Sequence, residues 1–167
     1  RGIAAHVVMP TSAKAVKRAA VEEYGAQVIS CEPTLEAREE TAAGVLAETG
    51  GTLIPPYDHP WIIAGQATAA AELLEDHPDL DAIVAPVGGG GLLAGTCLAA
   101  RVHGRRRGDA APALYAAEPT GADDCARSMA AGELILQTEP RTIADGLLTS
   151  LGEHTWPVIR DHVERIV

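Results

Sequence analysis

Residues 81–95 read D-A-I-V-A-P-V-G-G-G-G-L-L-A-G, and this stretch decides how the rest of the chain is interpreted. The apolar, β-branched run 82–87 is typical of a strand that is buried on both faces. Four glycines follow at 88–91, and Leu92 opens a small-residue helix expected to run through Ala100. Glycines let the backbone turn sharply and expose N–H groups, and a helix N-terminus adds partial positive charge. The pattern therefore predicts a phosphate-binding loop.

Two kinds of phosphate ligand fit this loop. Gly89, Gly91 and Ala94 satisfy the G-x-G-x-x-A variant of the dinucleotide fingerprint, and Glu118 ends the next expected strand. A cofactor with a single phosphate, such as pyridoxal phosphate, fits as well. A simple connecting turn is the third interpretation, but four glycines in a row cost more conformational entropy than a connection requires. The loop alone leaves the choice of ligand open.

The composition excludes several classes of protein. The chain has 167 residues and a net charge of −10, which argues against nucleic-acid binding. No apolar run reaches transmembrane length, and no signal peptide opens the sequence. Three cysteines without metal spacing are typical of reduced thiols, so we expect a cytoplasmic protein.

Alternating strand and helix patterns predict an α/β fold with open parallel sheets and right-handed crossovers. We expect a partial small lobe at 1–57 and part of a larger lobe at 58–167. The small lobe is predicted to be β-α-β-α-β, with strands at 4–9, 27–31 and 52–54 and helices at 13–24 and 35–48. The larger lobe is predicted to contain helices at 61–74, 92–100, 124–131 and 156–165 and strands at 82–87, 113–117, 134–137 and from 166 onward.

Three local features accompany this prediction. Ser12 is a plausible N-cap for the helix 13–24. The apolar residues of that helix share one face by periodicity, namely Val16, Ala20, Val21 and Tyr24. The basic run Arg105–Arg107 is predicted to lie in a solvated loop.

Four stretches together, and in this order, resemble one known family. They are P-Y-D-H-P-W-I-I-A-G-Q-A-T (56–68), P-V-G-G-G-G-L-L-A-G (86–95), A-A-E-P-T-G-A-D-D (116–124) and T-I-A-D-G-L (142–147). The chain resembles the fold-type II pyridoxal-phosphate enzymes, and within them the serine/threonine dehydratase and serine racemase group. The resemblance implies a tryptophan-synthase-β-like fold and favours pyridoxal phosphate over a dinucleotide.

The same resemblance implies a function for the complete enzyme. It is dehydration and deamination of L-serine or L-threonine to a 2-oxo acid and ammonia. The alternative is serine racemase activity, the interconversion of L-serine and D-serine, because the motifs do not separate the two subfamilies. A small amino-acid substrate and a homodimer are implied for the full-length form, with neither a nucleic acid nor a membrane as partner.

The matched positions assign candidate site residues. The family's loop, whose backbone amides hold the cofactor phosphate, corresponds to Gly88, Gly89, Gly90, Gly91 and Leu92, and a glycine beside the cofactor ring corresponds to Gly146. The divalent-cation site of racemase-like members corresponds to the carboxylates of Glu118 and Asp124 and the carbonyl of Ala122. Hard oxygen ligands suit Mg²⁺, Mn²⁺ or Ca²⁺. The alternative is that Asp123 or Asp124 only caps the helix that follows.

Other residues correspond to the family's cleft and effector site. Arg38 and Asp145 are the candidates for the substrate cleft, although a lone arginine on a helix is usually a solvated surface residue. Lys17 and Ala20 fall where the racemase contacts a nucleotide effector, and Lys17 can equally be an exposed surface side chain.

The lysine that forms the Schiff base with the cofactor lies upstream of the matched region. Lys14 and Lys17 are the only lysines, and neither occupies the family position, so no catalytic residue is assigned. Both ends run into expected strands, and we therefore expect a piece of a longer chain. A catalytically inactive phosphate-binding fragment is the remaining alternative.

Overall fold

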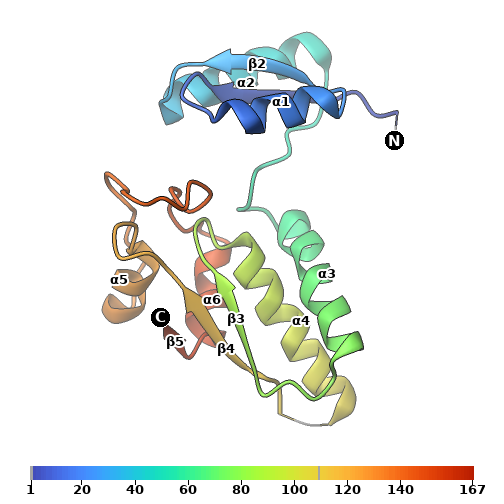
Figure 1. Cartoon of the computed structure of the whole chain (residues 1–167), viewed down its shortest axis with the longest axis vertical. Helices are drawn as coiled ribbons and strands as arrows, with labels where there is room; N and C mark the ends of the chain where they lie inside the picture. Colours follow the sequence, from blue (N-terminus) through green and yellow to red (C-terminus); the bar gives the residue numbers. More distant parts are fainter. Residues whose placement is uncertain (1, 109) are drawn as a thin grey trace. The chain divides into compact units, whose positions relative to one another are not determined.

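A computed structural model describes residues 2–108 and 110–167, without the side chain of Leu35. The chain divides into two compact units, residues 1–54 and 55–167, and each is described by itself (Figure 1). Among the described residues, each unit contains one sheet, and all the strand pairs are parallel. The predicted α/β class with parallel sheets is therefore confirmed. The division falls three residues before the boundary expected from the sequence, after Ile54 rather than after Tyr57.

The first unit is a two-stranded sheet with two helices. Its elements are β1 (His6–Pro10), α1 (Ala15–Glu23), β2 (Gln27–Cys31) and α2 (Leu35–Thr49). The strands pair in register from His6 opposite Gln27 to Pro10 opposite Cys31. Thr34 caps α2, because its hydroxyl accepts a hydrogen bond from the Ala37 N–H at 3.1 Å.

Two expectations for this unit are wrong. Residues 52–54 form no strand, and Leu53 and Ile54 are exposed. A strand needs a neighbour for its backbone hydrogen bonds, and in the described first unit only β1 and β2 pair. The N-cap of α1 is Lys14 rather than Ser12, and it makes no side-chain capping bond.

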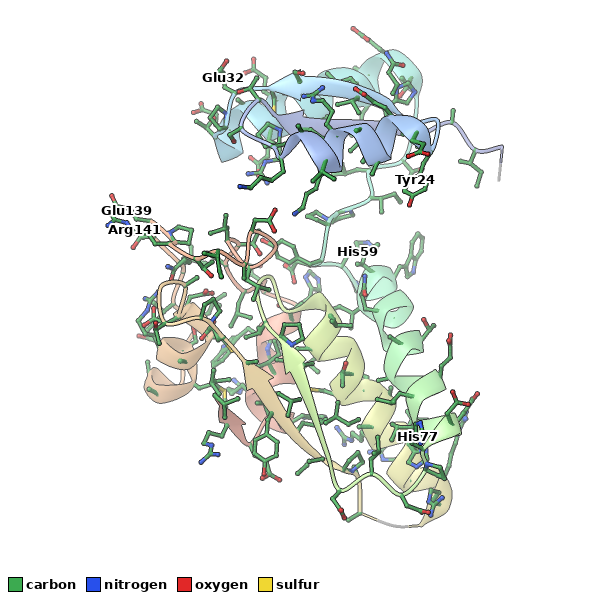
Figure 2. The ribbon with its side chains drawn as sticks, in the orientation of Figure 1. Tyr24, Glu32, His59, His77, Glu139 and Arg141 are labelled. Carbon is green, nitrogen blue, oxygen red and sulfur yellow. The ribbon has the colours of Figure 1, made fainter. Side chains whose placement is uncertain are left out.

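The apolar face predicted for α1 is not buried. Val16 is 75% exposed and Tyr24 is 87% exposed, and Tyr24 extends away from the helix (Figure 2). Periodicity predicts which side chains share a face, but burial also requires an element to cover that face. The described residues of the first unit leave these two positions exposed.

The described part of the second unit forms a three-stranded parallel sheet with four helices. Its elements are α3 (Pro60–Asp76), β3 (Ala82–Pro86), α4 (Gly91–Arg107), β4 (Ala113–Ala117), α5 (Asp124–Ala131), α6 (Thr155–His162) and β5 (Arg165–Ile166). The strand order is β3-β4-β5. The first and last residues of β4 and α5 are the ones predicted from the sequence.

The core of this unit lies on one face of the sheet. Ile83 and Ala85 of β3 point into a cluster with residues of α4 and α6, including Leu93 and Ile159. Val84 lies between them in β3, on the opposite face of the strand, and it is 60% exposed. The expectation of a strand buried on both faces is therefore wrong for this chain, because only one face of β3 is covered.

Helices α3 and α4 run side by side and pack closely (Figure 1). The contact depends on Gly95, where an added Cβ would lie 2.6 Å from the Ala67 nitrogen and 2.7 Å from the Ile63 carbonyl oxygen. Backbone approaches backbone at this crossing, so any side chain at residue 95 would push the helices apart.

Two further details differ from the sequence prediction. Arg105–Arg107 form the last turn of α4 rather than a loop, and they remain exposed there. Positive side chains at a helix C-terminus interact favourably with its dipole.

Residues 134–137 are not a strand, because side-chain hydroxyls accept hydrogen bonds from two of their backbone N–H groups. Ser128 accepts from the Ile135 N–H at 2.9 Å, and Ser150 accepts from the Gln137 N–H at 2.8 Å. Within the described ranges, no helix combines the length and apolar character needed to cross a bilayer.

We predict opposite effects for alanine at two helical glycines. Gly95→Ala is expected to destabilise the protein by about 1–3 kcal/mol, because the added methyl group overpacks the α3–α4 contact. Gly65→Ala, at a position with no atom within 4 Å of the new Cβ, is expected to stabilise it by about 0.5–1 kcal/mol through helix propensity. Urea unfolding of both variants measures the difference, and equal stabilities would contradict the close crossing.

Candidate functional site

The turn between β3 and α4 is buried and has a glycine-specific geometry. Gly88–Gly91 are all buried. Gly90 adopts φ 86°, a left-handed conformation that disfavours residues with a side chain, and it is the N-cap of α4. Since the capping residue has no side chain, the first N–H groups of α4 receive no bond from the N-cap position. N–H donors of this kind, together with the helix dipole, favour an anion at such a turn.

Segments far apart in the sequence surround this turn. The ring of Tyr57 occupies the space where a Cβ on Gly89 would lie. A Cβ on Gly88 would lie 3.1 Å from the Leu147 Cα and 3.2 Å from the Gly146 carbonyl oxygen. The structure therefore brings Gly146 next to the glycine loop, as the assignment of both to one site requires. An added Cβ at Gly146 itself would meet no atom within 4 Å, so open space adjoins that residue.

The N-terminus of α6 also contacts the turn. The hydroxyl of Thr155 donates to the Gly89 carbonyl oxygen at 2.9 Å and accepts from the Gly152 N–H at 2.9 Å. The carboxylate of Asp58 accepts from three consecutive backbone N–H groups, at residues 153, 154 and 155. His59, the next residue, caps α3 through its Nδ1, which accepts from the Trp61 N–H at 3.2 Å. Figure 2 shows His59 at the start of α3 and His77 at its end.

Glu118 at the end of β4 is bound to the N-terminus of α5. Its Oε1 accepts from the Cys125 N–H at 2.9 Å and its Oε2 accepts from the Ala126 N–H at 2.8 Å. Asp123 occupies the N-cap position of α5 but makes no side-chain capping bond, and its carboxylate pairs with Arg127 at 2.9 Å. Asp123 therefore does not cap this helix with its side chain, and Glu118 accepts from the N–H groups of Cys125 and Ala126 instead.

Asp124 is the second carboxylate of the predicted cation site, and it is 1% exposed. Its Oδ2 accepts from the Leu151 N–H at 2.9 Å. Burial raises the pKa of Asp124, although the Leu151 hydrogen bond opposes this effect. Burial likewise raises the pKa of Glu118, and the nearby negative charge of Asp124 adds to the increase. The negative charge of Asp124 therefore acts on Glu118 at the start of α5.

The loop between α5 and α6 is connected to the same region. The Arg141 N–H donates to the Gly121 carbonyl oxygen at 2.7 Å, and a Cβ on Gly121 would overlap the Arg141 carbonyl oxygen. Figure 2 shows Glu139 and Arg141 at the outer end of this loop. Ala122, whose carbonyl is the third predicted ligand, is buried. Across the described ranges, no three His, Cys, Asp or Glu side chains gather into a metal cluster.

The remaining candidates are distributed over both units. Asp145 is exposed in the loop that carries Gly146, where its N–H donates to the Ile143 carbonyl oxygen at 3.0 Å. Arg38 is exposed on α2, Lys17 is exposed on α1 and Ala20 is half-buried on α1. These three belong to the first unit, whereas the glycine loop, Gly146, Glu118 and Asp124 all belong to the second.

Sequence reasoning missed Asp58 and Thr155 as parts of this site. Asp58 lies within a matched motif, but nothing in the motif indicates that its carboxylate binds a helix about 95 residues later. Thr155 has no local signal, because its partner Gly89 is 66 residues away. Only the folded chain brings these residues together.

Comparison with known proteins identifies the family. The family described as "Pyridoxal-phosphate dependent enzyme" matches residues 1–167. The chain is 47% identical over 166 residues to a beta-hydroxyaspartate dehydratase from Paracoccus denitrificans (strain Pd 1222), covering 99% of this chain and 51% of that protein.

Two solved structures are similar in both sequence and fold. A serine racemase from maize superposes with a TM-score of 0.93 at 43% identity, over 99% of this chain and 49% of that one. A threonine deaminase from T.th. superposes with a TM-score of 0.88 at 41% identity, over 99% of this chain and 54% of that one. The chain thus spans about half the length of these relatives.

These matches confirm the resemblance drawn from the four motifs and the fold-type II assignment. They also decide between the two phosphate ligands, because the matched family uses pyridoxal phosphate rather than a dinucleotide. Since the match extends over the whole sequence, the chain belongs to the family of pyridoxal-phosphate-dependent enzymes.

Proposed function

We propose that the protein containing this chain dehydrates and deaminates L-serine or L-threonine to a 2-oxo acid and ammonia. The observation that carries the proposal is the buried glycine turn at the N-terminus of α4, with Gly146 beside it and no side chain at the N-cap. The relatives are named for serine, threonine and β-hydroxyaspartate, which all have a hydroxyl group on the β-carbon. An amino acid with a β-hydroxyl is therefore the proposed substrate class.

Serine racemase activity is the second candidate. It is favoured by the similarity to the maize serine racemase, at a TM-score of 0.93. Both reactions begin with removal of the α-proton, so one site serves both. They differ in whether the β-hydroxyl leaves or a proton returns on the opposite face.

In the proposed site, backbone amides of Gly88–Gly91 and Leu92 hold the cofactor phosphate. The N-terminus of α4 contributes its partial positive charge, which stabilises an anion at this position. We propose that Gly146 lies beside the cofactor ring, and its position next to both the glycine loop and open space supports this assignment. When bound, pyridoxal phosphate supplies an electron sink that makes the α-proton of the amino acid acidic.

The residues of this chain bind and orient, and we assign the proton transfer to none of them. Lys14 precedes α1 and Lys17 lies on it, in the first unit, and neither matches the family's Schiff-base position. Arg38 and Asp145 are proposed to face the substrate, and Lys17 and Ala20 to contact a nucleotide effector. A homodimer and a cytoplasmic location complete the proposal.

We also propose that Glu118, Asp124 and the carbonyl of Ala122 hold Mg²⁺, Mn²⁺ or Ca²⁺. Each carboxylate accepts backbone N–H bonds but has further lone pairs available for a cation. Burial raises the pKa of both groups, so the pair of negative charges is costly in the folded protein. A hard divalent cation would offset that cost and suits oxygen ligands. Its role would be to stabilise the second unit.

Product analysis with the full-length protein tests the proposed reaction. L-serine and L-threonine are supplied separately in the presence of pyridoxal phosphate, and 2-oxo acid, ammonia and D-serine are measured. Equal amounts of 2-oxo acid and ammonia would support the dehydratase, and D-serine in excess of 2-oxo acid would support the racemase. If neither product forms from a protein that binds the cofactor, both candidate reactions are wrong.

We predict that Gly146→Ala weakens cofactor binding without destabilising the fold. The new Cβ would meet no protein atom, so the melting temperature of the apoprotein should not fall. In the proposed holoenzyme the methyl group would enter the space beside the cofactor ring, and the affinity for pyridoxal phosphate should fall roughly tenfold or more. Absorbance titration with pyridoxal phosphate measures the change, and Gly65→Ala is the control. Unchanged affinity in Gly146→Ala would contradict the placement of the ring.

We predict that Asp124→Asn removes a cation-dependent gain in stability. The wild-type protein should melt at a higher temperature with Mg²⁺ or Mn²⁺ than with EDTA, because the cation binds only the folded state. Asp124→Asn should lose that increase. In EDTA near neutral pH it should be no less stable than wild type, because a neutral amide avoids the cost of a buried charge.

Asp123→Asn is the matched control for this experiment. It removes a carboxylate whose side chain is 45% exposed and which pairs with Arg127, and it should retain the cation-dependent increase. The cation site is wrong if wild type shows no increase, or if Asp124→Asn shows the same increase as wild type.

A further inference from the structure

We propose that Asp58 and Thr155 are positioning residues that hold the glycine loop in its phosphate-binding conformation. The proposal rests on the function proposed above, and it adds two residues that no motif assigns to the cofactor site. They act through the N-terminus of α6, which they connect to the turn between β3 and α4.

Asp58 anchors the start of α6. Its Oδ1 accepts from the His154 N–H at 2.9 Å and from the Thr155 N–H at 3.2 Å, and its Oδ2 accepts from the Glu153 N–H at 3.0 Å. These groups belong to the N-terminal end of the helix, where N–H donors lack intrahelical partners. A negative charge there is also favoured by the helix dipole. One carboxylate therefore fixes the position of a helix start that is distant in sequence.

Close packing reinforces this anchor. A Cβ on Gly152 would overlap the carboxyl group of Asp58, so only glycine allows the carboxylate to approach the backbone so closely. The neighbouring residue Tyr57 covers Gly89 and lies 3.1 Å from the position of a Cβ on Gly91. The segment that contains Tyr57 and Asp58 thus contacts both the glycine loop and α6.

Thr155 connects the start of α6 to the glycine loop by a hydrogen bond. It is fully buried, at 0% exposure, and its hydroxyl donates to the Gly89 carbonyl oxygen at 2.9 Å. The hydroxyl oxygen of Thr155 also accepts from the Gly152 N–H at 2.9 Å. An added Cβ on Gly90 would lie 2.8 Å from the Thr155 Oγ1, so this side chain also packs directly beneath the turn.

The hydrogen bond to Gly89 determines where the next N–H group points. In a trans peptide the carbonyl of one residue and the N–H of the next point in opposite directions. Since Thr155 holds the Gly89 carbonyl, the Gly90 N–H must point away from Thr155. In the proposed site that donor is one of those that face the phosphate. Loss of the hydroxyl would let this peptide rotate and would disorder the anion-binding turn.

The decisive experiment compares pyridoxal phosphate with pyridoxal, which lacks the phosphate, in the full-length protein. Thr155→Val removes the hydroxyl and retains the shape, and Thr155→Ser retains the hydroxyl. The Val variant should bind pyridoxal phosphate roughly tenfold more weakly, because a buried carbonyl loses its donor. Its affinity for pyridoxal should stay at the wild-type level. The Ser variant should restore most of the lost affinity for pyridoxal phosphate.

Asp58→Asn tests the other end of the connection. It should also weaken binding of pyridoxal phosphate, by about threefold to tenfold, because the amide can no longer accept from all three N–H groups. Asp161→Asn, at the other end of the same helix, is the matched control. Asp161 is 53% exposed and pairs with Arg160 at 2.7 Å, and its variant should bind the cofactor as wild type does.

The outcomes separate this inference from the proposed function. If the wild-type protein binds no pyridoxal phosphate, the proposed function is wrong and this inference is wrong with it. If wild type binds the cofactor and Thr155→Val binds it equally well, only the inference is overturned. The same holds if Thr155→Val loses affinity for pyridoxal and pyridoxal phosphate to the same extent, because the residue would then be structural only.

Discussion

The structure of the second unit depends on the turn at 88–91. Its four residues are glycines, and other segments of the chain pack into the space that side chains would occupy. Backbone atoms of 146–147 lie against Gly88, the ring of Tyr57 lies against Gly89, and Thr155 lies against Gly90. Because a Cβ would be crowded at each of these positions, the glycines permit close approach as well as a sharp bend. The turn is thus a buried junction at which the end of β3, the start of α4 and the start of α6 meet.

The N-termini of α5 and α6 are bound by carboxylates, whereas the N-terminus of α4 is not capped by its N-cap residue. Glu118 binds the first N–H groups of α5, and Asp58 binds those at the start of α6. Each is a carboxylate from outside the helix that it caps. At α4 the N-cap is Gly90, which has no side chain. A helix start without a capping side chain, placed at the end of a parallel strand, is where an anionic ligand is expected, and membership of a pyridoxal-phosphate family agrees with this feature.

Hydrogen bonds connect the proposed cation site to the glycine turn. Asp124 accepts from the Leu151 N–H, and the adjacent Gly152 N–H donates to Thr155, whose hydroxyl reaches Gly89. The two proposed ligand sites therefore share the backbone of residues 151–152.

The sequence by itself determined the family, the parallel α/β class, the limits of β4 and α5, and the glycine turn, because these follow from local patterns and from motifs in order. It did not determine burial: Val84 is exposed although the strand was predicted to be buried on both faces, and Tyr24 is exposed although it shares a helix face with other apolar residues. The strand expected at 134–137 was replaced by bonds to Ser128 and Ser150. Tertiary structure alone decided that Glu118 caps α5, that Asp58 binds the start of α6 and that Thr155 binds Gly89, because these contacts join atoms whose positions are related only after folding.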